Sequence, residues 1–340
     1  MKALLIENPG QVGFGTVTVP EPRPDEILLR VGVVGFCGSD LNTFRGLNPL
    51  VSYPRIPGHE IAAVVESVGA QVPADLFQVG AGVTVLPYTA CGECPACRRG
   101  RVNTCRSNQT LGVQRDGSLT RWIAVPWEKV VPTGRLSPHE AALVEPLSVG
   151  FHAVDRAAVA REDRVVVIGC GAVGLGAVAG AARRQATVIA VDVDDRKLEL
   201  ARRAGAQHLV NSRHTPLHPR LQELTAGDGP DVVIEAVGLP ETFVAAVSEV
   251  SFAGRVVYIG YSKAPVSYDT AQFVKKELDI RGSRNATRGD FEAVIEMLGS
   301  AAFPVDDAVT RVVPFAEAGD ALHAWDADPS SVTRIHVKLD

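Results

Sequence analysis

The 340-residue sequence lacks the features that mark membrane, secreted and repetitive proteins. No apolar run approaches the roughly 20 residues that a helix needs to cross a bilayer. The apolar start at residues 3–6 turns polar at Glu7, which is too early for a secretory signal peptide. The chain also shows no internal repeat and no low-complexity tract. We therefore expect a cytoplasmic protein with no membrane partner.

An excess of charge of one sign is also missing. The chain has 34 Lys and Arg against 39 Asp and Glu, for a formal net charge of -5. This balance argues against a nucleic-acid partner, and it does not favour any class of small substrate. Hydrophobic residues at 46% and charged residues at 21% are typical of a globular protein. The length fits two domains of ~150 residues each.

Cysteine is scarce, with six residues, and four of them are clustered. Their C-x2-C-x2-C-x7-C spacing would let four thiolates close a tetrahedral shell around a structural zinc ion. Disulfides are disfavoured without a secretory signal, whereas an iron-sulfur cluster remains an alternative. A basic run at 98–101 could also make this lobe, about residues 88–108, a nucleic-acid-binding zinc ribbon, which the net charge disfavours. The four residues are Cys91, Cys94, Cys97 and Cys105.

A second set of metal-binding residue types lies upstream. Cys37 precedes the stretch Pro57-Gly58-His59-Glu60. Sulfur, imidazole nitrogen and carboxylate oxygen together suit Zn²⁺, and a catalytic zinc keeps one position open. The alternatives are a buried structural cysteine, a solvated histidine, and a helix-capping role for Ser39. The pattern predicts a metal site with a vacant position.

The secondary-structure pattern changes near residue 163. Before it, short strands alternate with turns rich in proline and glycine. Ser137, Pro138 and Glu140 then predict a capped helix that carries Glu145. After it, apolar runs alternate with helical segments, which predicts a doubly wound parallel sheet. These runs lie at 165–169, 187–191, 231–235, 255–259 and 278–282.

The first of these runs leads into a G-x-G-x-x-G pattern that opens a helix, where backbone amides can meet a pyrophosphate. Asp192 ends the second run, where it would bind the ribose hydroxyls and favour NAD. Arg196 would instead favour NADP. We expect the glycine pattern and two later turns to contact the cofactor, through Gly169, Gly171, Ala172, Val173, Gly174, Val237, Gly238, Ile259 and Gly260.

These motifs, together with Glu145-Pro146-Leu147, resemble the zinc-dependent medium-chain dehydrogenase/reductase superfamily over essentially the whole chain. The resemblance implies a GroES-like catalytic domain at 1–147 and 284–340, and a Rossmann NAD-binding domain at 148–283. It also implies a catalytic zinc on Cys37 and His59, with Glu60 or Glu145 as a further ligand. Ser39 matches the position that takes the substrate proton, but Asn42 stands where many relatives have a histidine.

Within the superfamily the chain looks most like the polyol and sugar-acid dehydrogenases, such as sorbitol, threonine and aldonate 5-dehydrogenases. We therefore expect two zinc ions per chain, NAD, and oxidation of a secondary hydroxyl of a polyol, sugar or sugar acid by a homodimer or homotetramer. The alternatives are an NADP-linked carbonyl reductase and a non-catalytic, zinc-stabilised nucleotide-sensing or nucleic-acid-binding protein. The candidate substrate-binding residues are Arg45, Asn48, Arg284 and Asn285.

Overall fold

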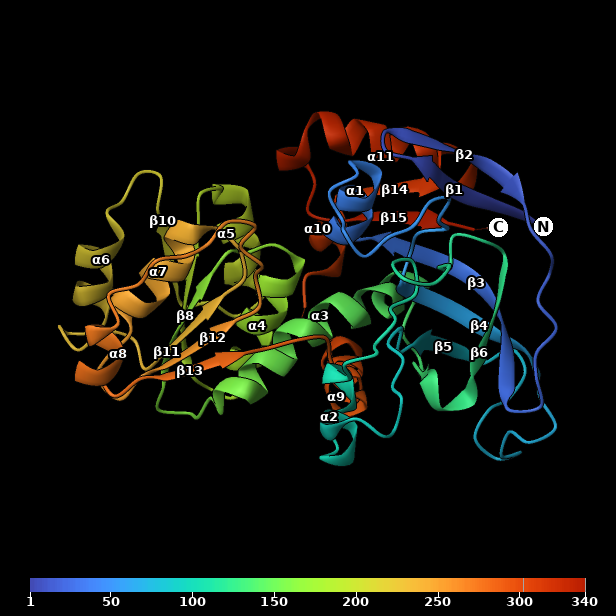
Figure 1. Cartoon of the computed structure of the whole chain (residues 1–340). Coiled ribbons are helices and arrows are strands. Elements are labelled where there is room, and N and C mark those ends of the chain that lie inside the picture. Colours follow the sequence, from blue (N-terminus) through green and yellow to red (C-terminus); the bar gives the residue numbers. More distant parts are fainter. Residues whose placement is uncertain (302, 340) are drawn as a thin grey trace. The chain divides into compact units, whose positions relative to one another are not determined.

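The computed structural model describes residues 1–301 and 303–339, and the chain divides into two compact units (Figure 1). Unit 1 comprises Met1–Glu145, Thr287–Ser300 and Val305–Asp340, and unit 2 comprises Pro146–Ala286 and Ala301–Pro304. The sequence had placed the divisions after Leu147 and after Ser283. Each unit contains its own sheet.

Unit 2 is built on a six-stranded parallel sheet, as the sequence predicted. The spatial order of the strands is β10-β9-β8-β11-β12-β13, so two three-strand halves meet between β8 and β11. This is the order of a dinucleotide-binding doubly wound fold. The strands are β8 (Arg164–Ile168), β9 (Thr187–Asp192), β10 (His208–Asn211), β11 (Val232–Glu235), β12 (Arg255–Tyr258) and β13 (Asp279–Gly282).

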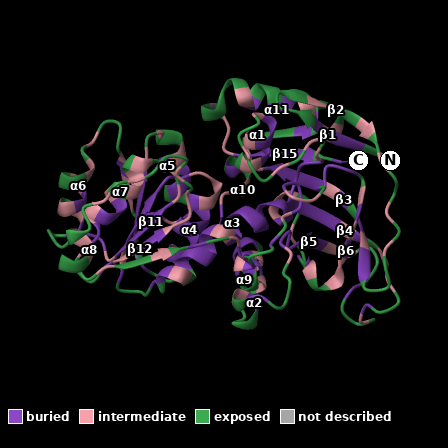
Figure 2. Cartoon of the chain, in the orientation of Figure 1, coloured by how far each residue is buried: buried purple, intermediate pink, exposed green. Residues whose placement is uncertain are grey.

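Helices connect these strands, and the central strands β8, β9 and β11 are largely buried, whereas the edge strand β13 is mostly exposed (Figure 2). Val166, Val233 and Val256, on three adjacent strands, are fully buried in one core cluster. Burial on both faces explains the continuous apolar runs. The helices are α4 (Ala172–Arg183), α5 (Asp195–Arg203), α6 (Leu217–Leu224), α7 (Pro240–Glu249), α8 (Ala271–Lys275) and the second part of α3 (Pro138–Ala157).

Unit 1 is rich in strands. β1 (Lys2–Asn8) and β2 (Gln11–Thr16) form an antiparallel pair, and a seven-stranded sheet has the order β14-β15-β3-β4-β5-β7, with β6 paired to β3. Strands from both ends of the chain therefore meet in one sheet. They are β3 (Glu26–Phe36), β4 (Glu60–Val68), β5 (Gly82–Val85), β6 (Trp122–Pro126), β7 (Val130–Pro132), β14 (Arg311–Pro314) and β15 (Ile335–Lys338).

The helices of unit 1 are mostly short. The predicted capping box at the start of α3 is present, because Ser137 N donates to Glu140 Oε2 at 2.6 Å and Glu140 N donates to Ser137 Oγ at 3.3 Å. The sequence of residues 291–298 also predicts a helix, and the structure has α9 there, which begins three residues earlier. The helices are α1 (Gly38–Phe44), α2 (Pro95–Arg98), α9 (Arg288–Gly299), α10 (Val305–Ala308), α11 (Ala318–Ala327) and the first part of α3.

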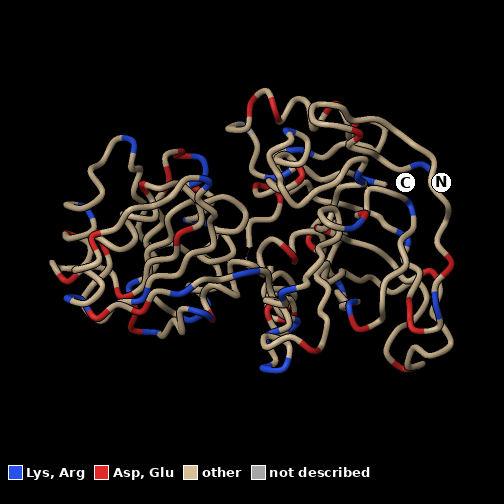
Figure 3. The backbone as a smooth tube through the Cα atoms, in the orientation of Figure 1, with Lys and Arg blue, Asp and Glu red and all other residues tan. Residues whose placement is uncertain are grey.

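Charged residues of both signs are interspersed along the backbone of each unit (Figure 3). A nucleic-acid-binding domain would instead gather Lys and Arg on one face. Within the part of the chain that the structure describes, no helix combines the length and the apolar character that a membrane crossing requires.

Candidate active site and metal sites

The sheet of unit 1 brings the upstream metal-binding residues together. Cys37 directly follows β3, and Glu60 begins β4, whose antiparallel register places Glu60 opposite Gly35. Because one strand ends where the other begins, Cys37 lies beside His59 and Glu60. One ligand atom from each of these three residues lies within 4.8 Å of the others.

Two buried polar atoms of this group lack a hydrogen-bond partner within the described part of the chain. Among the described residues, His59 Nδ1 and Glu60 Oε2 are buried and have no hydrogen-bond partner. A Cβ atom at position 35 would lie 2.2 Å from Glu60 Oε2, so Gly35 leaves room for that carboxylate. Orphaned buried polar atoms are costly unless a ligand pairs with them. A divalent cation bound by sulfur, nitrogen and oxygen fits this set.

Asp40 fixes the two segments that carry these residues. Its Oδ2 accepts a hydrogen bond from Cys37 N at 2.8 Å, and its Oδ1 accepts one from Gly58 N at 3.2 Å. The helix α1 therefore begins with Cys37 at the N-cap and Asp40 as its capping side chain. The suggestion that Ser39 caps this helix is wrong. Ser39 Oγ is instead buried without a partner among the described residues.

Arg334 is a member of this site that sequence reasoning missed. It is 5% exposed, and its guanidinium donates to Glu60 Oε1 at 2.5 Å and to the carbonyl oxygen of Phe36 at 2.8 Å. The pairing of β15 with β3 places Ile335 opposite Phe36, so Arg334 arrives beside Cys37. Arg334 therefore holds one oxygen of Glu60 and leaves the other oxygen free.

The pKa values show how much negative charge the site concentrates. Burial raises the pKa of Glu60 to about 7 against the opposing effect of Arg334. Burial also raises the pKa of Asp40. Burial alone would lower the pKa of His59, but its hydrogen bond to Cys37 and the charges of Cys37, Asp40 and Glu145 raise it well above its usual value. A bound divalent cation would take the place of the protons that these groups otherwise retain.

Glu145 has a different environment from Glu60. It is buried on α3, and the hydroxyl of Tyr88 donates a hydrogen bond to its Oε1. Tyr88 is itself buried, and burial together with the Glu145 charge raises its pKa well above the usual value. Of the two competing carboxylates, Glu60 is therefore the one grouped with Cys37 and His59, and Glu145 is engaged by a phenol.

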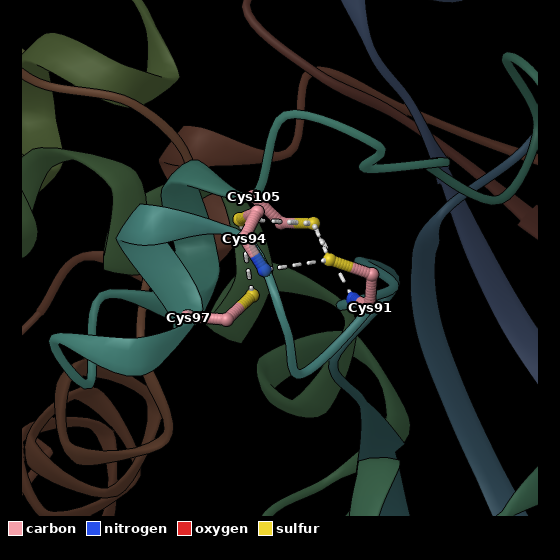
Figure 4. Close-up of side chains that lie close together, drawn as sticks. All are labelled: Cys91, Cys94, Cys97 and Cys105. Carbon is pink, nitrogen blue, oxygen red and sulfur yellow. Dashed lines mark hydrogen bonds between the residues drawn. The ribbon is translucent and has the colours of Figure 1, made fainter.

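The cysteine lobe forms a second, separate cluster (Figure 4). Its Sγ atoms lie 3.5 Å apart for Cys94 and Cys97, 4.0 Å for Cys94 and Cys105, and 3.5 Å for Cys91 and Cys105. These distances exclude disulfides, whose sulfurs are ~2.05 Å apart. Four sulfurs at ~2.3 Å from a tetrahedral zinc ion would lie about 3.8 Å apart, which matches the cluster.

In unit 2 the glycine pattern forms the expected strand-to-helix turn. A Cβ atom at Gly174 would lie 1.8 Å from the carbonyl oxygen of Gly169, so only glycine permits this approach of helix to strand. A Cβ atom at Gly171 would meet no protein atom within 4 Å, which leaves open space for a phosphate. Asp192 Oδ2 accepts a hydrogen bond from Cys170 N at 2.7 Å, so the carboxylate lies against this turn.

The remaining candidates fall into three groups. Arg196 pairs with Asp194, which caps α5, at 2.8 Å. Arg45 pairs with Asp326 of α11 at 2.5 Å, and the Asn48 side chain bonds within its own turn, to Thr43 Oγ1 and Leu50 N. Arg284 and Asn285 belong to unit 2, directly after β13.

Comparison with known proteins identifies the family. Residues 23–135 match the alcohol dehydrogenase GroES-like domain, and residues 172–300 match the zinc-binding dehydrogenase domain. The chain therefore belongs to the zinc-dependent medium-chain dehydrogenase/reductase superfamily, as its motifs indicated, and is a zinc-type dehydrogenase with a GroES-like and a Rossmann domain.

Its relatives include enzymes of sugar and polyol metabolism. The chain is 34% identical to the L-galactonate-5-dehydrogenase of Escherichia coli K12 over 93% of this chain and 92% of that protein. It is also 34% identical to the sorbitol dehydrogenase of Bacillus subtilis over 95% of this chain and 92% of that protein.

Solved structures agree with the fold and differ in their cofactor. An alcohol dehydrogenase from E. coli CFT073 complexed with NADH is 30% identical, covers 99% of both chains and superposes with a TM-score of 0.91. A zinc-binding dehydrogenase from Sinorhizobium meliloti bound to NADP is 28% identical, covers 99% of this chain and 98% of that one, and has a TM-score of 0.90.

Proposed function

We propose that this protein is an NAD-dependent zinc dehydrogenase that oxidises a secondary hydroxyl of a polyol, sugar or sugar acid to the ketone. The observation that carries the proposal is the group of the half-buried Cys37 with the buried His59 and Glu60, together with the Ser39 hydroxyl, which has no partner among the described residues. A non-catalytic zinc protein would not need orphaned buried ligands outside its cysteine lobe. A cytoplasmic homodimer or homotetramer fits this function.

The residues of unit 1 have different roles in the proposed reaction. Cys37, His59 and Glu60 would hold zinc, and Asp40 fixes the backbone of the segments that carry them. Bound zinc would lower the pKa of a coordinated hydroxyl, much as it brings water to ~7, and bound NAD would accept the hydride. Ser39 Oγ, two residues after Cys37 and without a partner among the described residues, would receive the substrate's proton.

The chain's own residues also limit how that proton leaves. Asn42 stands at the position where many relatives have a histidine, and an amide cannot carry a titrating proton. The proton would therefore pass from Ser39 to water or to a ribose hydroxyl. Glu145 accepts a hydrogen bond from Tyr88 and is a further buried carboxylate near the site. It is not one of the three residues that would bind the zinc ion.

The environment of Asp192 favours NAD over NADP. Its carboxylate lies at the glycine turn, where it would bind ribose hydroxyls and repel a 2′-phosphate, whereas Arg196 is paired with Asp194. We expect Asp192→Ala to weaken NAD binding and to reduce the ratio of kcat/KM for NAD over NADP by about tenfold or more, since one charged hydrogen bond contributes about 1.5–3 kcal/mol. A wild-type preference for NADP would show instead that Arg196 governs the adenosine site.

The proposed substrate class rests on two candidate arginines, Arg45 and Arg284. A guanidinium can hold a carboxylate through two parallel hydrogen bonds. Arg45 is paired with Asp326, and Arg284 and Asn285 directly follow β13; either arginine is a candidate for binding the distal end of a sugar acid. The other pair, Arg45 and Asn48, would need to give up contacts within unit 1.

Kinetic comparison of aldonates, polyols and simple alcohols tests this substrate class. We expect an aldonate or polyol to be the best substrate, and Arg284→Ala to lower kcat/KM for the acid by about 10- to 150-fold, from the loss of one charged hydrogen bond. Simple secondary alcohols serve as the control, since they offer no carboxylate. If simple primary alcohols are preferred, the protein is a plain alcohol dehydrogenase.

A further inference from the structure

Glu235 is a fully buried carboxylate of unit 2 that the proposed chemistry does not use. It is the last residue of β11, at the carboxyl ends of the strands, where the Rossmann fold binds its ligand. Among the described residues its Oε2 has no hydrogen-bond partner, although buried carboxylate oxygens are almost always paired. A side chain with this desolvation cost requires an explanation.

The other oxygen of Glu235 organises one turn. Oε1 accepts hydrogen bonds from Val237 N at 2.8 Å, Gly238 N at 2.7 Å and Thr242 Oγ1, in α7, at 2.7 Å. These three donors curl the chain of residues 236–238 around the carboxylate and attach it to the start of the helix. The turn's shape therefore depends on a single acceptor atom.

The same residue contacts a second turn. Its carbonyl oxygen accepts a hydrogen bond from Ile259 N at 2.9 Å, and its Oε2 would lie 2.5 Å from a Cβ atom at position 260. That Cβ atom would also lie 2.4 Å from Gly238 N, so a glycine is required where the two turns meet. Glu235 thus sets the separation of the turns that follow β11 and β12.

The sheet order indicates what these turns bind. β8, β9 and β10 form one mononucleotide-binding half, with the glycine turn and Asp192, and β11, β12 and β13 form the other. Val237 packs so close to the glycine turn that a Cβ atom at Gly169 would lie 2.6 Å from its Cγ2, yet Val237 remains 44% exposed. The turn at 236–238 therefore continues the binding surface from the pyrophosphate towards the second nucleoside.

We propose that Glu235 is a positioning residue that shapes the 236–238 and 259–260 turns to receive the nicotinamide half of the dinucleotide. This inference rests on the proposed function, because it assumes that unit 2 binds NAD. Glu235 does not contact the cofactor, since it is fully buried, and acts through the backbone of Val237 and Gly238.

A comparison of two ligands tests the proposal in the full-length, zinc-loaded protein. NADH contains the nicotinamide half, whereas ADP-ribose lacks the nicotinamide ring and keeps the adenosine diphosphate that the glycine turn and Asp192 would bind. Calorimetry gives both affinities. Glu235→Met removes the acceptor at similar volume, and Glu235→Gln keeps one acceptor oxygen and serves as the matched variant.

We expect Glu235→Met to weaken NADH binding by about 10- to 100-fold, since several donors lose their acceptor, and ADP-ribose binding by less than about threefold. Glu235→Gln should restore NADH affinity to within about tenfold of wild type. Asp192→Ala should give a different pattern, because it should weaken the binding of NADH and of ADP-ribose to a similar extent.

An equal loss of affinity for both ligands in Glu235→Met, or an unchanged affinity for NADH, would overturn the proposed role of Glu235. If Glu235→Met does not fold, Thr242→Val decides, because it removes one of the three donors to Glu235 Oε1 together with the Thr242 contacts to Leu239. It should weaken NADH binding about three- to tenfold and leave ADP-ribose binding unchanged. Wild-type protein that binds neither ligand would instead contradict the proposed NAD-dependent function itself.

Discussion

Replacing His59 with alanine is expected to abolish turnover and remove one zinc ion while leaving the protein folded. His59 supplies one of three clustered ligand atoms, and two remaining ligands bind zinc poorly. Zinc contributes several kcal/mol to the stabilisation of developing charge, so its loss should lower kcat/KM by about 10³-fold or more. Steady-state kinetics and elemental analysis of the same preparation measure both effects.

Cys94→Ser is the matched control, because it removes a ligand from the other cluster. Cys94 is buried, and the backbone amides of Cys97 and Arg106 lower its pKa to about 6, which favours the thiolate that zinc requires. This variant should also lose one zinc ion, but with a reduced thermal stability. Retained turnover in His59→Ala, or an unchanged melting temperature in Cys94→Ser, would contradict the division of roles between the two sites.

Replacing Arg334 with methionine is expected to destabilise unit 1 more than any exposed ion-pair deletion. Arg334 is buried, and its removal leaves the buried Glu60 carboxylate without its cation. Loss of one partner of a buried pair costs about 3–5 kcal/mol. The corresponding fall in melting temperature is on the order of 10 °C for a protein of this size.

Arg45→Ala provides the comparison for Arg334→Met. Its pair with Asp326 is partly exposed, so its loss should cost only about 0–1 kcal/mol. Adding Glu60→Gln to Arg334→Met should recover part of the stability, because it removes the stranded charge. Differential scanning calorimetry would count against the assigned role if Arg334→Met were no more destabilising than Arg45→Ala.

The sequence was sufficient to predict a candidate site wherever its residues lie in one short stretch of the chain. The cysteine lobe, the glycine turn and the pair His59-Glu60 each occupy a few neighbouring residues, and the structure brings each group together as a local unit. The parallel sheet was predictable for a similar reason, because strands buried on both faces must be apolar throughout.

Arg334 was not predictable, because 274 residues separate it from Glu60. Its position depends on the register of β15 against β3, which no local pattern encodes. Tyr88 meets Glu145 through tertiary packing in the same way. The Ser39 cap failed for a different reason: α1 begins at Gly38 with Cys37 at the N-cap, so Ser39 lies inside the first turn of the helix.

The helix α11 was missed although its pattern was visible. Its buried residues recur with the spacing of one helical face, which a count of apolar periodicity would have detected. They are Ala318, Ala321, Leu322 and Trp325. This helix also carries Asp326, the partner of Arg45, so the omission hid the contact that weakens Arg45 as a substrate-binding candidate.

The zinc content of the folded wild-type protein tests the central claim most directly. The claim is that one cluster of four thiolates and one cluster of Cys37, His59 and Glu60 each hold a metal ion. Elemental analysis of protein purified in the presence of zinc should give two zinc ions per chain. A single zinc ion per chain in fully folded, zinc-supplied protein would contradict the account.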